Sequence, residues 1–101
     1  MIIRDFYHDE IELTNERWAY VVGKHPEVRS HHSKIALVLK EPDVVKSSKR
    51  DKNILLYYKF FPEILKGKYL LIVVAKGLRN FIVTVYVTDK IKGGEVVWRK
   101  S

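Results

Sequence analysis

The sequence predicts an α+β fold in which two short N-terminal helices pack on one face of a four-stranded antiparallel β-sheet. Apolar residues recur at helical spacing in the N-terminal part, and β-branched and aromatic residues fill four runs in the second half. Turn residues separate these runs. A chain of 101 residues holds one hydrophobic core, so we expect a single domain over residues 1–101.

The chain is expected to begin with an extended segment followed by a helix. Residues His8–Leu13 alternate between apolar and acidic side chains, which is typical of a short strand or an extended arm. The first helix is expected at Asn15–Lys24, because Thr14 is a suitable N-cap and Pro26 disfavours helical geometry just before it.

The second helix is expected between Ser30, which can cap it, and Glu41, because Pro42 prevents it from continuing. Helices of about ten residues are marginal alone in water, so both must dock on the sheet. The four strands of that sheet are expected at Val44–Ser48, Ile54–Phe61, Tyr69–Ala75 and Phe81–Thr88. Short loops connect these strands, which favours an antiparallel meander.

Side-chain alternation divides the strands into two faces. On the last strand, the core face is assigned to Phe81, Val83, Val85 and Val87. The opposite face, left open by the helices, is assigned to Tyr57, Lys59, Thr84, Tyr86 and Thr88. That face would be polar, aromatic and cationic, and it is the first candidate binding surface. A register slip of one residue would reverse the faces of a strand.

Charge and composition narrow the class of partner. Lys plus Arg number 19 and Asp plus Glu 12, which gives a net charge of +7 and favours nucleic acid first, an acidic protein second and a membrane surface third as the partner.

The absence of Cys excludes disulfides and thiolate sites. No apolar run reaches the roughly 18 residues that span a bilayer, and no signal peptide is visible, so a cytoplasmic location is expected. The absence of Gln and the abundance of Lys resemble proteins of hot-growing organisms.

His25 and Glu27 are the first candidates for chemistry. The negative end of the helix dipole and the neighbouring carboxylate both favour the protonated imidazole, so His25 could exchange protons near neutral pH. The alternative is a structural histidine that caps the helix.

His31 and His32 are adjacent and do not face the same way on a helix, so no metal site is expected. No cofactor is expected either.

Two further segments are rich in polar and cationic side chains and are candidate binding or catalytic sites. The run from Lys46 to Lys52, which includes Arg50, is either a phosphate-binding turn or a solvated hairpin tip that protects a sheet edge. At the end of the last strand, Tyr86 and Thr88 offer hydroxyls and Lys90 offers a mobile cation. The alternative there is an ordinary surface turn.

A set of short motifs occurs in a fixed order along the chain. They are Thr14-x-x-Arg17-Trp18, His25-Pro26-Glu27, Glu41-Pro42-Asp43, Leu56-Tyr57-Tyr58-Lys59, Tyr86-x-Thr88-Asp89-Lys90-Ile91 and Trp98. This order resembles a family of small phage and prokaryotic domains grouped with barnase, EndoU, colicin and RelE-type nucleases. The resemblance implies two N-terminal helices and a four-stranded antiparallel sheet over residues 1–101.

The resemblance also implies a metal-independent endoribonuclease, toxin-like or RNA-processing, in which the 2′-OH of RNA attacks the adjacent phosphate to give a 2′,3′-cyclic phosphate. His25 would act as base or acid, with Glu27 as an alternative base. Groups that would stabilise charge or bind the phosphate are Lys59, Arg50, Lys90, Tyr86 and Thr88. Tyr57 would stack a base, and Arg17 and Lys46 would contact the nucleic acid. Tyr20 stands where similar sequences carry a second histidine, and a phenol is a poor base at neutral pH.

Two other functions remain open. The protein could be a non-catalytic module that binds RNA, and possibly DNA, with a strong salt dependence. It could instead be a basic interaction domain that binds an acidic protein such as an antitoxin.

Overall fold

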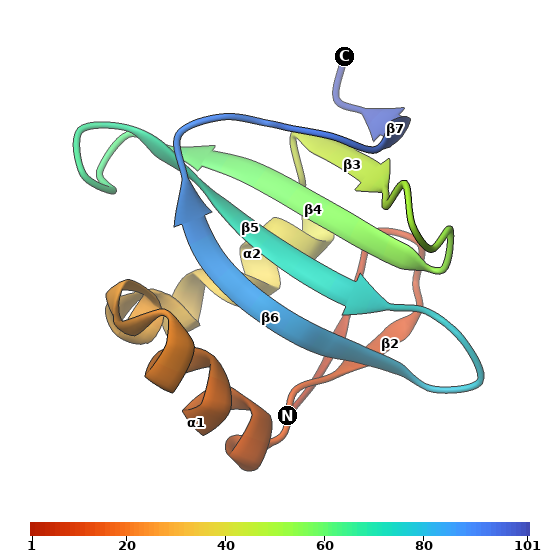
Figure 1. Ribbon diagram of the computed structural model, residues 1–101, viewed down its shortest axis with the longest axis horizontal. Coiled ribbons are helices and arrows are strands. Elements are labelled where there is room, and N and C mark those ends of the chain that lie inside the picture. The colour runs from red at the N-terminus through yellow and green to blue at the C-terminus, as the bar shows by residue number, and fades with distance from the viewer.

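A twisted β-sheet with helices on one face forms the body of the protein, as the computed structural model of residues 1–101 shows (Figure 1). Its strands are β1 (Ile2–Arg4), β2 (Glu10–Glu12), β3 (Val44–Ser47), β4 (Ile54–Phe61), β5 (Lys68–Ala75), β6 (Asn80–Thr88) and β7 (Glu95–Arg99). The order across the seven-stranded sheet is β1-β2-β6-β5-β4-β3-β7. The β2–β6 pair is parallel and every other pair is antiparallel.

The predicted four-stranded sheet is therefore wrong. The meander from β3 to β6 is antiparallel, but β1, β2 and β7 enlarge it into a mixed sheet. β2 lies within His8–Leu13, where the alternation predicts a short strand or an extended arm, but its place in the sheet is not predicted. β1, with three residues, and β7, with five, are not predicted at all. Backbone pairing with residues distant in the sequence defines all three, and such pairing is invisible to local patterns.

The helical elements are α1 (Asn15–Lys24), the 3₁₀ helix η1 (Pro26–Lys34) and α2 (Ile35–Lys40). α1 has its predicted bounds, because the Thr14 side chain accepts a hydrogen bond from the Arg17 N–H at 3.0 Å. The second helix differs from the prediction. Its expected first turns are part of η1, and no side chain caps the start of α2. None of the helices has the length and apolar character that crossing a membrane requires.

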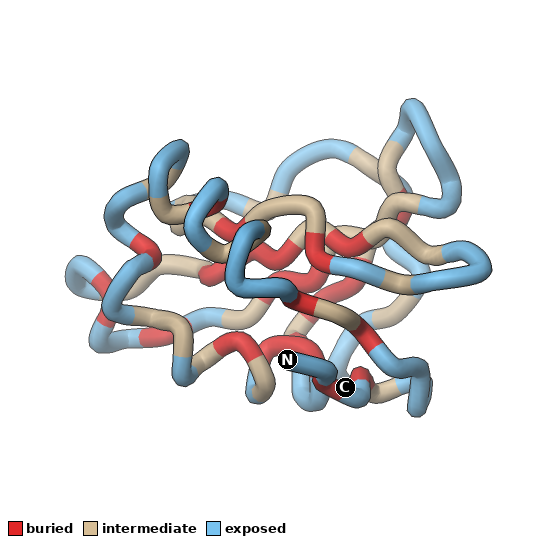
Figure 2. Tube along the Cα trace, turned by 90° about the horizontal axis from the view of Figure 1, so that it is seen from below, coloured by how far each residue is buried: buried red, intermediate tan, exposed pale blue.

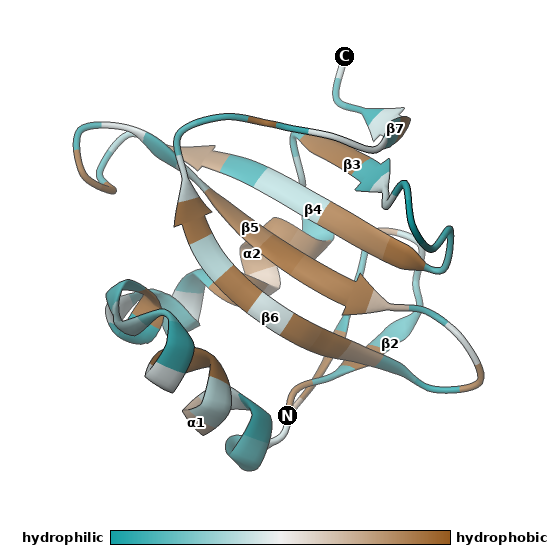
Figure 3. Cartoon of the chain, viewed as in Figure 1, coloured by the Kyte–Doolittle hydropathy of each residue, from teal (hydrophilic) through white to brown (hydrophobic).

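The main core lies between the sheet and the helices. Buried side chains from β4, β5 and β6 pack against Val21 of α1, Val28 of η1 and the apolar face of α2. The buried segments run through the middle of the molecule, while the loops at its margins are exposed (Figure 2). The central strands are also the most hydrophobic part of the chain, whereas α1 is largely hydrophilic (Figure 3).

A β-bulge in β6 changes the predicted faces. Val73 pairs with Thr84, but Val74 pairs with Ile82, so Val83 is an extra residue in the strand. Ile82 is consequently buried in the core and Phe81 is 40% exposed. The assignment of Phe81 and Val83 to the core is wrong, because the bulge interrupts the alternation between Ile82 and Thr84.

The face of the sheet away from the helices carries a smaller apolar cluster. Val44, Tyr58 and Leu71 are buried there. Residues 89–94 connect β6 to β7 at the other side of the sheet (Figure 1), and Ile91 packs against this cluster. A hydrogen bond fixes this connection to β3, because Lys46 Nζ donates to the Gly93 carbonyl oxygen at 2.7 Å. We call this side of the sheet the outer face.

Candidate active site beside the free edge of β6

Most of the β6 edge is not paired with a strand. β2 pairs with β6 only at Asn80 and Phe81. Beyond them α1 lies beside β6 (Figure 1). The Arg17 guanidinium donates to the Val83 carbonyl at 3.3 Å. This contact fixes α1 next to the strand and brings the C-terminal end of the helix toward the end of β6.

Three of the predicted catalytic residues meet at that point. His25 is the C-cap of α1, and its backbone N–H donates to the Val21 carbonyl at 2.7 Å. Its ring stacks on Tyr86 with ring centres 5.1 Å apart and an angle of 27° between the planes. Its Nδ1 lies 3.9 Å from Glu27 Oε2. We call His25, Glu27 and Tyr86 the His25 cluster.

The His25 cluster is accessible and only partly occupied by internal contacts. The side chains of His25 and Glu27 are 35% and 40% exposed. The Tyr86 hydroxyl, on the half-buried outer side of β6, donates to no protein group. An imidazole, a neighbouring carboxylate and a phenol without a protein partner are kinds of group that can serve acid–base catalysis on a phosphate ester.

Two cations lie on the adjacent surface of α1. Arg17 and Lys24 are placed over the Tyr20 ring, at 5.3 and 5.8 Å from its centre. Neither cation forms an ion pair, and Tyr20 is 53% exposed. Position 20 therefore presents an exposed aromatic ring with two cations that have no acidic partner.

Tyr57 is far from its predicted position on the outer face. It is fully buried on the helix side, and its hydroxyl donates to the Asp5 carboxylate. Burial, and then the hydrogen bond with Asp5, raise the pKa of Tyr57 above its ordinary range. Tyr57 cannot stack a base in this structure, because a one-residue shift of the expected register places Tyr58 on the outer face instead.

Lys59 is also on the helix side, so its placement on the outer face is wrong. Its Nζ donates to the Glu41 carbonyl at 2.7 Å and lies 3.7 Å from Asp43 Oδ1. Its side chain is 14% exposed. The structure does not bring Lys59 to the His25 cluster; it connects β4 with the end of α2.

The remaining predicted residues occupy different places. Thr88 is on the outer side of β6, but its hydroxyl is used in the turn, where it donates to the Lys90 carbonyl at 3.2 Å and accepts from the Lys90 N–H at 3.4 Å. Lys90 is exposed beside it. Lys46 is bound to the 89–94 connection, and Arg50 is exposed in the β3–β4 turn, at the end of the sheet opposite Thr88.

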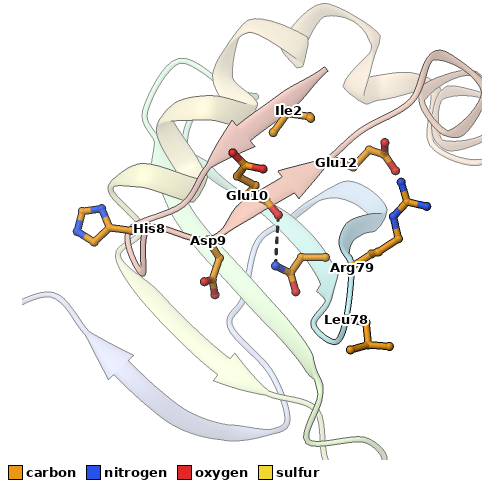
Figure 4. Close-up of a pocket in the computed structure, with 8 residues that line it drawn as sticks. Ile2, His8, Asp9, Glu10, Glu12, Leu78 and Arg79 are labelled. Carbon is orange, nitrogen blue, oxygen red and sulfur yellow. Dashed lines mark hydrogen bonds between the residues drawn. The ribbon is translucent and has the colours of Figure 1, made fainter.

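A hollow of about 380 Å³ lies beside β1, β2 and the β5–β6 loop (Figure 4). It is lined by Ile2, His8, Asp9, Glu10, Glu12, Leu78, Arg79 and Asn80. The Asn80 amide donates to the Glu10 carbonyl at 3.2 Å across it. Asp9 and Glu10 already pair with Lys76 and Arg4, so the hollow has no excess of positive charge that would select a phosphate. No group of His, Asp and Glu in the chain is arranged to hold a metal ion.

Sequence reasoning missed a buried polar cluster formed by Asp5, Tyr57 and Lys76, which we call the Asp5 cluster. Lys76 Nζ donates to Asp5 at 2.7 Å and to Asp9 at 2.8 Å. Lys76 is 71 residues from Asp5 in the sequence, so no local pattern indicates the pairing. Comparison with protein-family models, with curated proteins and with solved structures finds no match for this chain.

Proposed function

We propose that this protein is a metal-independent endoribonuclease whose active site is the His25 cluster. The observation that supports the proposal is the exposed stack of His25 on Tyr86, with the Glu27 carboxylate 3.9 Å from Nδ1. The resemblance of the ordered motifs to nuclease domains points to the same residues. The net charge of +7 favours the polyanionic substrate.

The proposed reaction uses the 2′-OH of the substrate as nucleophile. His25 takes the proton of this hydroxyl, the 2′ oxygen forms a bond to phosphorus, and the bond from phosphorus to the 5′ oxygen breaks. The 5′ oxygen takes up a proton from water and the other product is a 2′,3′-cyclic phosphate. Tyr86 donates a hydrogen bond to a phosphate oxygen, while Arg17 and Lys24 offset the charge that develops there.

The site contains one imidazole, so a single side chain moves the proton. Glu27, 3.9 Å from the ring, can orient it, but no second imidazole stands beside Tyr86, and a phenol is in general a weak acid at neutral pH. We therefore expect slow turnover. We place this activity in the cytoplasm, as the sequence predicts.

A second candidate function is RNA binding without cleavage. The specific observation that favours it is the Tyr20 ring between Arg17 and Lys24, an arrangement suited to stacking a base next to a phosphate. The binding of an acidic protein partner stays a prediction.

The test is to incubate the protein with labelled single-stranded RNA in EDTA, beside the same sequence as a 2′-deoxy oligonucleotide. We expect cleavage of the RNA alone, with a cyclic phosphate end. His25→Gln should lower the cleavage rate about 10²–10⁴-fold. His8→Asn is the matched control, because His8 is exposed and has no side-chain partner. Asn also tolerates the left-handed backbone at His8, where φ is +70°.

Three results would contradict the proposal. Cleavage of the 2′-deoxy strand excludes the 2′-OH mechanism. Equal loss of activity in the His25 and His8 variants moves the site elsewhere. If the protein shifts RNA in a gel but forms no cleavage product, it binds RNA without catalysis.

A further inference from the structure

The outer face continues from the His25 cluster onto two more aromatic side chains. Tyr86 pairs with Leu71, and Thr88 pairs with Tyr69, so Tyr86 and Tyr69 are diagonal neighbours on the same face. Side chains in that relation lie about 7–8 Å apart, within the reach of aromatic rings. Phe60 pairs directly with Tyr69 on the next strand. An aromatic row therefore runs across β6, β5 and β4.

The two rings at the far end of this row are held in place; Phe60 is exposed and Tyr69 is half-buried. The Phe60 and Tyr69 ring centres are 5.4 Å apart, with 72° between the planes. Phe60 is 44% exposed. Gly67, whose φ is +106°, lets the β4–β5 loop pass against the edge of the Phe60 ring, where any Cβ would overlap it. Rings that are already fixed lose little entropy when they bind a ligand.

The loops beside the rings carry a small excess of positive charge. Lys66 directly precedes Gly67, and Lys90 and Lys92 lie in the connection that follows Thr88. Glu63 and Asp89 are the acids of the same two loops. None of the three lysines forms an ion pair, so all are free to contact phosphates.

We infer that Tyr69 and Phe60 form a base-stacking subsite for single-stranded RNA. The inference rests on the proposed function for the position of the scissile phosphate, at the His25 cluster. The strand then continues along the row, with neighbouring bases against Tyr69 and Phe60 and their phosphates near the loop lysines. Every base has a π face, so this subsite is tolerant of sequence, whereas a duplex hides these faces and is excluded.

Binding of an oligonucleotide that cannot be cleaved tests the subsite independently of catalysis. The probe is a labelled, 2′-O-methylated single strand of about eight nucleotides, a length that matches common single-strand sites. The readout is fluorescence anisotropy. Phe60→Leu and Tyr69→Leu keep apolar volume but remove the ring. Phe81→Leu is the matched control, because Phe81 is also exposed (40%) but lies at the other end of β6.

We expect each subsite variant to weaken binding about tenfold, and the control to bind as the wild type does. The inference is overturned if all three variants bind alike, or if a duplex of the same length binds as tightly as the single strand. Loss of binding confined to the Phe60 and Tyr69 variants supports it even if the wild type cuts no RNA. In that outcome the stacking subsite stands and the proposed nuclease function fails.

Discussion

The Asp5 cluster and the His25 cluster use the same kinds of side chain in opposite surroundings. Each combines a carboxylate, a tyrosine and a basic group. In the Asp5 cluster the carboxylate is fully buried and accepts hydrogen bonds from Tyr57, from Lys76 and from the backbone N–H groups of Tyr7 and Asp9. In the His25 cluster the carboxylate is 40% exposed and lies 3.9 Å from its imidazole partner.

The difference separates a structural role from a chemical one. A buried carboxylate is stable only when its charge and hydrogen bonds are fully compensated, and Asp5 meets that condition. Its cluster ties the N-terminal segment to β4 and to the end of β5. The groups of the His25 cluster keep unused hydrogen-bonding capacity, which a substrate can take up.

The largest expected effect is on the stability of the fold. Asp5→Ala removes the buried acceptor of the Tyr57 hydroxyl and of two backbone N–H groups, and it leaves Lys76 with the half-exposed Asp9 as its one partner. We therefore expect a loss of about 3–5 kcal/mol in the free energy of unfolding. Chemical denaturation measures it. Glu10→Ala is the control, because it breaks the exposed Arg4–Glu10 pair and should cost about 0–1 kcal/mol.

If the alanine variant does not fold, Asp5→Asn extends the test. Its amide oxygen can still accept the hydrogen bonds from the backbone N–H groups of Tyr7 and Asp9. The rate of RNA cleavage per folded molecule should stay unchanged in both variants. Equal stability of the Asp5→Ala and Glu10→Ala proteins would show that the buried cluster is not a structural anchor.

The next effect is on cleavage rather than stability. Tyr86→Phe keeps the ring stacked on His25 but removes the hydroxyl that we expect to bind the phosphate. A hydrogen bond to a charged group of this kind corresponds to about 10–100-fold in rate. Single-turnover cleavage measures it, and the denaturation midpoint should not move.

Tyr58→Phe is the matched control for Tyr86. Tyr58 lies on the same face, but its hydroxyl donates to the Lys92 carbonyl at 3.3 Å, so its loss should affect stability slightly and leave the rate unchanged. If Tyr86→Phe cleaves RNA as fast as the wild type does, the phenol does not contact the phosphate.

The smallest effect is a pH dependence of stability from His31. Burial, and then the charge of Lys34, lower the pKa of His31, although Glu63 and Glu27 act in the opposite direction. Its Nδ1 is buried without a hydrogen-bond partner. The folded state therefore binds fewer protons at this site than the unfolded state does. Stability should fall slightly as the pH decreases below about 6.5, the ordinary value for histidine.

The effect is measured as the change in denaturation midpoint when the pH is lowered from neutral to below the ordinary pKa of histidine, about 6.5. His31→Asn should flatten the dependence relative to the wild type, whereas His8→Asn should not change it. A wild-type slope that persists in the His31 variant would assign the effect to another group.

Local signals in the sequence were sufficient for some elements. The Thr14 cap and Pro26 define α1 within a few residues of the chain, and the strands β3, β4, β5 and β6 carry their own β-branched and aromatic runs. The grouping of His25 with Glu27 follows from their spacing. These features depend on neighbours in the chain, so the residue pattern alone determined them.

The tertiary structure decided which face each side chain occupies and what lies beside it. The bulge at Val83 reverses the alternation in β6, and the pairing of β4 with β3 and β5 places Tyr57 in the core and Tyr58 on the outer face. The contact of His25 with Tyr86 depends on where α1 docks against β6. Register and docking are set by the summed packing of residues distant in sequence, which no short segment contains.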